Sequence, residues 1–137
     1  YICWATKNRS ALIRIPQIDA CESSAARAEI RSPDATSNPY VLFAGLLAAG
    51  LAGLEEAHHL QVPIEKNLYK LSPEQVRELD IMILPENLTQ ALSCLRESDF
   101  AHRALGYRFV EEFLSLKEKE VLNFNRSITD WEWQRYA

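Results

Sequence analysis

The 137-residue chain is poor in cysteine and glycine and has no excess of positive charge. Its three cysteines, Cys3, Cys21 and Cys94, are odd in number, widely spaced and not at metal-ligand spacing, so we interpret them as buried or incidental thiols of a reducing cytoplasm. The four glycines form no phosphate-binding loop of the known kinds. A net charge of -4 argues against nucleic acid as a partner, because such proteins need a basic surface.

No apolar run is long enough to suggest a membrane-spanning segment. The longest, residues 40–54 (YVLFAGLLAAGLAGL), falls short of the roughly 20 residues that a bilayer requires. Asn38 can cap a helix and Pro39 suits a first helical position, so a helix is predicted to begin here. We interpret it as a buried helix packed behind strands, and we expect no membrane partner.

The composition, with 47% hydrophobic and 25% charged residues, fits one modest domain or part of one. We predict an α+β fold in which a strand-rich segment, residues 1–37, precedes a helical segment, residues 38–137. Capping residues and apolar spacing predict further helix starts. These lie at Ser72–Pro73, Asn87, Asp99, residue 107 and Thr129. Gly106 is expected to end the short helix that Asp99 begins.

Two short runs near the start alternate between apolar and polar side chains, as strands do. The apolar face of each run is expected to pack on a core. These faces are formed by Ala11, Ile13 and Ile15 in residues 8–16, and by Ala26, Ala28 and Ile30 in residues 26–31. In the second run Arg27, Glu29 and Arg31 share the opposite face. Arg14 lies on the polar face of the first run, and Arg9 at its entrance. If the runs pair, four arginines and one glutamate converge.

Such a cluster favours a site that handles anions. Guanidinium groups repel one another unless phosphate or carboxylate neutralises them, and they bind both groups in bidentate fashion. A carboxylate held between arginines stays ionised, which is the form that Mg²⁺ requires. The sequence therefore suggests phosphoryl chemistry. A solvated edge strand whose charges point into water is the alternative reading of the same residues.

Several motifs in these runs and beyond resemble one known family. They are Asn8-Arg9-Ser10, Arg14-Ile15-Pro16, residues 27–31, Ser32-Pro33-Asp34, Asn38-Pro39-Tyr40, residues 65–69 and residues 129–132. In this order, and over essentially the whole chain, they resemble the C-terminal part of glutamine synthetase. The resemblance implies that residues 1–137 are a C-terminal portion of the catalytic domain. An N-terminal β-grasp domain and most metal-binding carboxylates would then lie upstream, and the fragment alone would be inactive.

The resemblance also implies an activity. In the family, ATP phosphorylates the γ-carboxylate of glutamate, and ammonia then displaces phosphate from the γ-glutamyl phosphate. Divalent ions, Mg²⁺ or Mn²⁺, bridge the phosphates and the protein carboxylates. Family members are cytoplasmic and assemble from identical subunits into stacked rings, usually dodecamers. ATP, glutamate, ammonia and further copies of the same protein are thus the expected partners.

Residue roles follow from the same resemblance. Glu29 matches a metal-binding glutamate, and Arg31 matches the arginine that contacts glutamate and the transferred phosphoryl group. Arg9 and Arg14 match arginines that hold ATP phosphates, and Arg27 lies where a further nucleotide contact is expected. Arg9 and Arg31 are the expected catalytic and glutamate-binding residues. Tyr69 aligns with the tyrosine that some bacterial members adenylylate, although the next residue is lysine where those members usually carry an acid.

Two alternatives to an ammonia ligase stay open. A related ligase of the same family would join glutamate to an organic amine such as a polyamine, because the ammonia-site residues mostly lie upstream. A non-catalytic paralogue would instead serve assembly or regulation. The presence of all four residues Arg9, Arg14, Glu29 and Arg31 argues against a paralogue that has lost catalysis.

Overall fold

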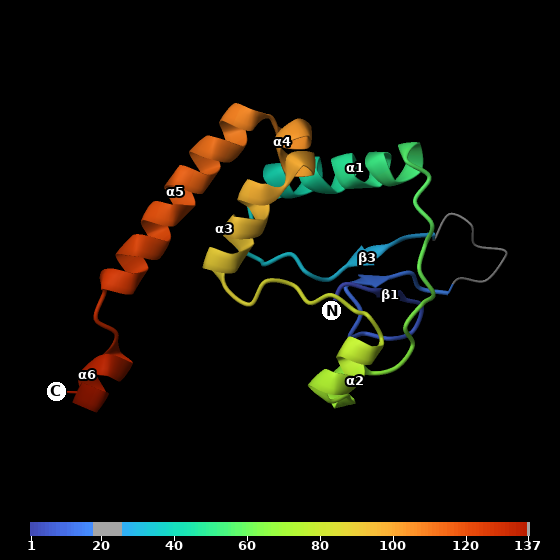
Figure 1. The fold of residues 1–137 in the computed structure, drawn as a ribbon, viewed down its shortest axis with the longest axis horizontal. Coiled ribbons are helices and arrows are strands. Elements are labelled where there is room, and N and C mark those ends of the chain that lie inside the picture. Colours follow the sequence, from blue (N-terminus) through green and yellow to red (C-terminus); the bar gives the residue numbers. More distant parts are fainter. Residues whose placement is uncertain (18–25, 137) are drawn as a thin grey trace. The chain divides into compact units, whose positions relative to one another are not determined.

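The structure is a computed structural model that describes residues 1–17 and 26–136 (Figure 1). Cys21, named above, lies outside the described residues. The chain forms two compact units, one of Tyr1–Leu42 with Gly50–Leu84 and the other of Phe43–Ala49 with Pro85–Ala137. A small sheet in the first unit and a majority of helical elements confirm the predicted α+β class. The predicted division of the chain at residue 37 stays a prediction.

The sheet has three two-residue strands in the order β1-β2-β3. They are β1 (Trp4–Ala5), β2 (Ile13–Arg14) and β3 (Glu29–Ile30). β2 and β3 pair antiparallel with Arg14 opposite Glu29, which confirms the pairing predicted from the two alternating runs. β1 joins β2 in parallel and was not predicted, because residues 1–5 are all apolar and show no alternation.

The prediction that the apolar faces of both runs pack on a core is wrong for the second run. Ala26 and Ala28 are exposed, and Ile30 keeps 36% of its surface accessible. In the first run Ala11 is buried and Ile13 half-buried, whereas Ile15 is 38% exposed. Besides Ala11, the buried apolar residues of this unit lie outside the two runs, at Ala5, Leu68 and Val76. Residues on the same alternating face therefore differ in burial, so alternation along the chain does not predict which side chains are covered.

Helix α1 (Pro39–Glu55) begins as predicted, with Asn38 Oδ1 accepting from the backbone N–H groups of Tyr40 at 3.0 Å and Val41 at 3.4 Å. The prediction that this helix is buried is wrong, since none of its residues is buried and Leu54 is 80% exposed. The helix is apolar all round, so it would need neighbours on every side, and the described residues supply too few. None of the described helices is long and apolar enough to cross a membrane.

The first unit ends with two short helical elements. The 3-10 turn η2 (Leu68–Lys70) is capped by Asn67, and its Leu68 is fully buried. α2 (Pro73–Glu78) begins with the predicted capping box: Gln75 N donates to Ser72 Oγ at 3.3 Å, and Ser72 N donates to Gln75 Oε1 at 2.8 Å. Both elements start where a polar side chain accepts from an otherwise unpaired N–H group.

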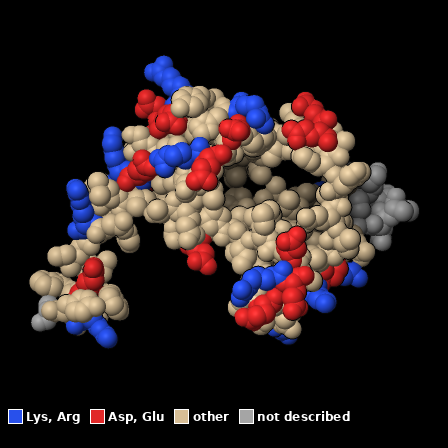
Figure 2. Space-filling view, viewed as in Figure 1, with Lys and Arg blue, Asp and Glu red and all other residues tan. Residues whose placement is uncertain are grey.

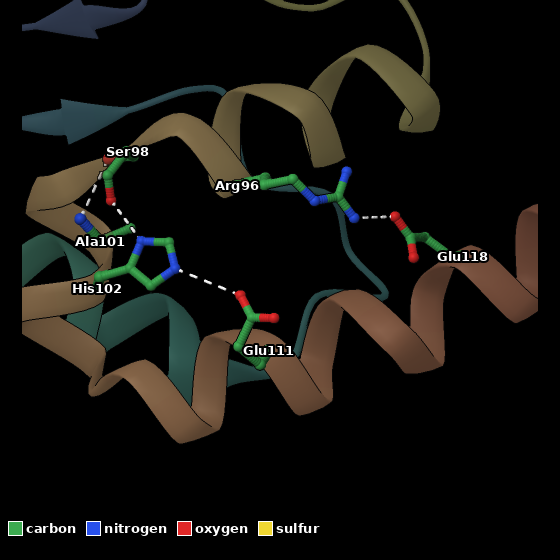
Figure 3. Close-up of polar contacts among 6 residues, drawn as sticks. All are labelled: Arg96, Ser98, Ala101, His102, Glu111 and Glu118. Carbon is green, nitrogen blue, oxygen red and sulfur yellow. Dashed lines mark hydrogen bonds and ion pairs between the residues drawn. The ribbon is translucent and has the colours of Figure 1, made fainter.

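The second unit contains α3 (Leu88–Glu97), α4 (Asp99–Leu105), α5 (Tyr107–Arg126) and α6 (Asp130–Tyr136). The predicted starts at Asn87 and Thr129 are confirmed by the hydrogen bonds that their side chains accept. α3 and α5 pack together around Leu92, Val110 and Leu114. An ion pair between Arg96 and Glu118 also joins these two helices (Figure 3).

The predicted cap of α4 is wrong by one residue. Ser98 is the N-cap, because its Oγ accepts from Ala101 N at 3.1 Å, and Asp99 is already the first helical residue (Figure 3). Ser98 also contributes its carbonyl oxygen, which lies 2.9 Å from His102 Nδ1, and His102 Nε2 lies 3.6 Å from Glu111 Oε1 on α5. Gly106 ends α4 with a φ of +89°, as predicted, because a residue without Cβ adopts this conformation without strain.

A candidate anion-binding site on the paired strands

A cluster of three charged residues lies on one face of the β2–β3 pair. Arg14 and Glu29 are register partners, so their side chains share a face, and Arg14 Nη1 donates to Glu29 Oε2 at 2.9 Å. Arg27, two residues before Glu29, shares this face. Its Nη2 lies 3.3 Å from Glu29 Oε1, and its Nε donates to the same oxygen at 3.4 Å. The structure thus brings together three of the five charged residues predicted to converge.

The cluster keeps Glu29 ionised. The hydrogen bond from Arg14 and the positive charges of Arg14 and Arg27 lower the pKa of the Glu29 carboxyl from its ordinary value. The side chain of Glu29 is 31% exposed, so solvent and ligands can reach it. Arg14 is 25% exposed, and its Nε is buried with no hydrogen-bond partner in the described part of the chain. A buried N–H without a partner is costly.

Arg9 and Arg31 lie outside this cluster. Both are exposed, and neither forms an ion pair with another residue of the ranges 1–17 and 26–136. Arg31 N donates to Leu12 O at 2.9 Å, which continues the strand pairing by one residue. Arg9 lies in the turn that precedes β2. The two residues expected to be catalytic therefore present their guanidinium groups to solvent.

The turn that carries Arg9 is attached to a distant segment of the chain. Asn8 and Ser10, on either side of Arg9, are buried. Asn8 Nδ2 donates to Ile64 O at 2.8 Å and to Lys66 O at 2.6 Å, and Asn8 Oδ1 accepts from Ser10 N at 2.9 Å and Ser10 Oγ at 2.6 Å. Ser10 Oγ in turn accepts from Leu68 N at 3.0 Å. These bonds connect two of the motifs on which the family resemblance depends.

Glu65 completes this connection. Its Oε1 accepts from Thr6 N and Thr6 Oγ1, both at 2.7 Å, and its Oε2 accepts from Lys7 N at 3.0 Å and Asn8 N at 3.2 Å. The bonds from the Thr6 hydroxyl and backbone, followed by those from Lys7 and Asn8, lower the pKa of the Glu65 carboxyl to about 2. Sequence reasoning assigned Glu65 no role, because its partners are 57 to 59 residues away and no local spacing reveals them.

Glu65 makes the stability of the protein depend on pH. Its pKa is about 2 in the folded state and returns to its ordinary value of 4.5 on unfolding, so the unfolded state takes up the proton first. The contribution of Glu65 is fully present above about pH 5 and is lost as the pH falls toward 2. Urea denaturation between pH 6 and pH 3 is expected to show a shallower loss of stability in Glu65→Gln than in the unchanged protein. Parallel profiles would contradict this assignment.

A family model described as glutamine synthetase, catalytic domain, matches residues 1–136. This chain belongs to the glutamine synthetase family. It is 42% identical to the glutamine synthetase of Methanocaldococcus jannaschii over 98% of this chain and 29% of that protein. It is also 42% identical to the glutamine synthetase of Thermotoga maritima, over 99% of this chain and 30% of that protein.

A solved structure agrees with the family assignment. A chain described as "Apo GmaS without ligand" superposes with a TM-score of 0.76 at 28% identity, covering 98% of this chain and 29% of that chain. The chain therefore spans about 30% of the length of the glutamine synthetases and the solved structure that it matches.

For a member of the glutamine synthetase family, the fit to a divalent metal ion is partial. Glu29 offers an ionised carboxylate, the oxygen ligand that Mg²⁺ and Mn²⁺ prefer. Within residues 1–17 and 26–136, however, no group of three or more His, Cys, Asp and Glu side chains could hold a metal. Glu29 alone is too few ligands for a metal ion, so a site that included it would need further ligands from outside the described residues.

Tyr69, the predicted modification site of this glutamine synthetase family chain, lies in η2. Its side chain is 75% exposed, and its ring centroid is 6.0 Å from that of Tyr1. The hydroxyl group of so exposed a residue is within reach of a modifying enzyme. Its adenylylation stays a prediction.

The charged residues of the chain are mixed in sign. On the face shown in Figure 2, basic and acidic side chains of the described residues are interspersed over both units. Within the first unit, Arg14 and Arg27 place two positive charges beside Glu29.

Proposed function

We propose that this chain supplies phosphate-binding arginines and one metal-binding glutamate to an ATP-dependent glutamate–ammonia ligase. The observation that carries the proposal is the Arg14–Glu29–Arg27 cluster on the β2–β3 pair of a glutamine synthetase family chain. A solvated edge strand accounts less well for it, because Arg14 has a buried Nε without a partner among the described residues.

Each arginine has a role that its environment supports. Phosphoryl transfer needs cations already positioned around the oxygens on which charge develops. Arg14 and Arg27 are held in place by Glu29 and would bind ATP phosphates through the N–H groups that Glu29 does not occupy. Arg9 and Arg31, both exposed, would contact ATP phosphate, the glutamate substrate and the phosphoryl group in transfer.

Glu29 would hold Mg²⁺ or Mn²⁺ together with carboxylates from outside the described residues. The ion, when bound, would offset the negative charge of the phosphates. Glu29 can take this part while paired with Arg14 and Arg27, because each carboxylate oxygen has more than one lone pair. The same carboxylate would then keep the two arginines near the metal-bound phosphates.

We further propose assembly of the cytoplasmic enzyme from identical subunits. Large apolar side chains stay exposed on α1 and α6, among them Phe43, Leu47, Trp131 and Trp133. Exposed apolar surface of this extent is typical of interfaces. The 137-residue chain by itself is expected to be inactive, because it supplies only one predicted metal ligand.

Phosphate release from ATP and glutamate by the complete ligase tests the proposal. Release that depends on added ammonia is the expected result. Release with putrescine but not with ammonia would replace the ammonia ligase by a γ-glutamyl-amine ligase. No release with either amine, in a folded protein that binds no ATP, would identify a non-catalytic paralogue and overturn the proposal.

A further inference from the structure

We propose that Glu65 is a positioning residue that acts through Arg9. The inference rests on the proposed function, which gives Arg9 a part in binding ATP phosphate and glutamate. Glu65 itself contacts Thr6, Lys7 and Asn8, and none of its four hydrogen bonds involves Arg9. Its influence would pass through the backbone of the turn.

The first support is the contrast between Arg9 and its neighbours. Arg9 is exposed, whereas Asn8 and Ser10 are 8% and 7% exposed. An arginine side chain has many rotamers, so the place of its guanidinium depends on how firmly its backbone is held. Here the residues on both sides are fixed by hydrogen bonds to the backbone of residues 64–68.

The second support is the number of bonds that one carboxylate accepts. Three consecutive backbone N–H groups, from Thr6, Lys7 and Asn8, converge on Glu65, together with the Thr6 hydroxyl. Consecutive N–H groups can all point at one anion only in a particular backbone conformation, so these bonds restrain the backbone. They belong to the three residues immediately before Arg9, so Glu65 determines the direction in which the chain enters the turn.

The third support is that the neighbouring polar side chain of Asn8 could not replace Glu65 there. Asn8 binds the carbonyl groups of Ile64 and Lys66, which flank Glu65. Its Nδ2 therefore holds the segment but cannot accept from the N–H groups of Thr6 and Lys7. In Glu65→Gln, one acceptor oxygen becomes an NH₂ group, which would face N–H donors and push part of the turn away.

The test is a double-mutant cycle in the complete ligase, with kcat/KM for ATP as the readout. Arg9→Ala and Glu65→Gln are each expected to lower kcat/KM by about 10- to 100-fold, since small misplacements of binding groups have effects of this size. Because Glu65 acts through Arg9, the double variant is expected to lie within about twofold of Arg9→Ala alone. Glu55→Gln, an exposed glutamate at the end of α1, is the matched control and should match the unchanged enzyme.

The outcomes separate the inference from the function on which it rests. If Arg9→Ala retains full activity, the proposed role of Arg9 fails. If Arg9→Ala is impaired but Glu65→Gln is not, or if the two effects multiply in the double variant, the positioning role is overturned and Glu65 is merely structural. Should Glu65→Gln fail to fold, Thr6→Val replaces it in the double-mutant cycle and is judged by the same criteria, because it removes one of the four hydrogen bonds to Glu65. Thr6→Ser keeps the hydroxyl group, so its kcat/KM is expected to return to that of the unchanged enzyme.

Discussion

Replacing Arg31 by alanine in the complete ligase is expected to lower kcat by about 10²- to 10³-fold. The proposed role of Arg31 is to contact the phosphoryl group while it moves from ATP to glutamate. An interaction that strengthens as charge develops on the phosphoryl oxygens lowers the barrier itself, so its loss reduces kcat rather than only raising KM. Initial rates of phosphate release at saturating ATP and glutamate measure the effect.

The fold should tolerate this change. The Arg31 side chain is exposed, and the contribution of Arg31 to the sheet is its backbone N–H, which donates to Leu12 O and is kept in Arg31→Ala. Arg31→Lys keeps the positive charge but lacks the planar guanidinium group, so its kcat should lie between those of Arg31→Ala and the unchanged enzyme. Arg108→Ala removes an exposed arginine of α5 and serves as the control. Turnover near normal in Arg31→Ala would remove Arg31 from the proposed mechanism.

The largest effect on stability is expected for Leu114→Ala. Leu114 is 2% exposed and lies in the α3–α5 core with Leu92 and Val110. Truncation removes buried methyl groups and leaves a cavity, which typically lowers the free energy of unfolding by about 2–5 kcal/mol. Urea denaturation of the 137-residue chain, followed by the helical circular dichroism signal, measures the loss.

Leu116→Ala is the matched control, because it makes the same substitution two residues further along α5. Leu116 is 56% exposed, so a change within about 0.5 kcal/mol is expected. Equal losses of unfolding free energy at both positions would contradict the described packing, in which Leu114 is buried against α3 and Leu116 is exposed. A large loss at Leu114 alone would support this packing.

Features set by neighbours in the sequence were predictable. Helix starts at Asn38, Ser72, Asn87 and Thr129 depend on a side chain that bonds an N–H group two or three residues later, so the residues that decide them are adjacent. The cap of α4 was misplaced by one residue because Ser98 and Asp99 are both good caps, and the sequence contains nothing local that chooses between them.

The candidate site was predictable only in part. Alternation placed Arg27 and Glu29 on one face, and the antiparallel pairing then brought Arg14 to the same carboxylate. Burial was predicted poorly: the Ala28 face is exposed, and no residue of α1 is buried. Alternation and apolar character show which surfaces could be buried, but they do not show whether another element covers them.

By itself, the sequence determined the local structure and the family: the helix caps, the facing charges of the two strands and the ordered motifs of glutamine synthetase. Only the tertiary structure decided that Asn8, Ser10 and Glu65 take part in one set of hydrogen bonds that joins the turn around Arg9 to residues 64–68. The physical reason is the separation in sequence between the interacting groups. Caps and strand faces depend on residues a few positions apart, whereas the bonds of Glu65 join groups that only folding brings together.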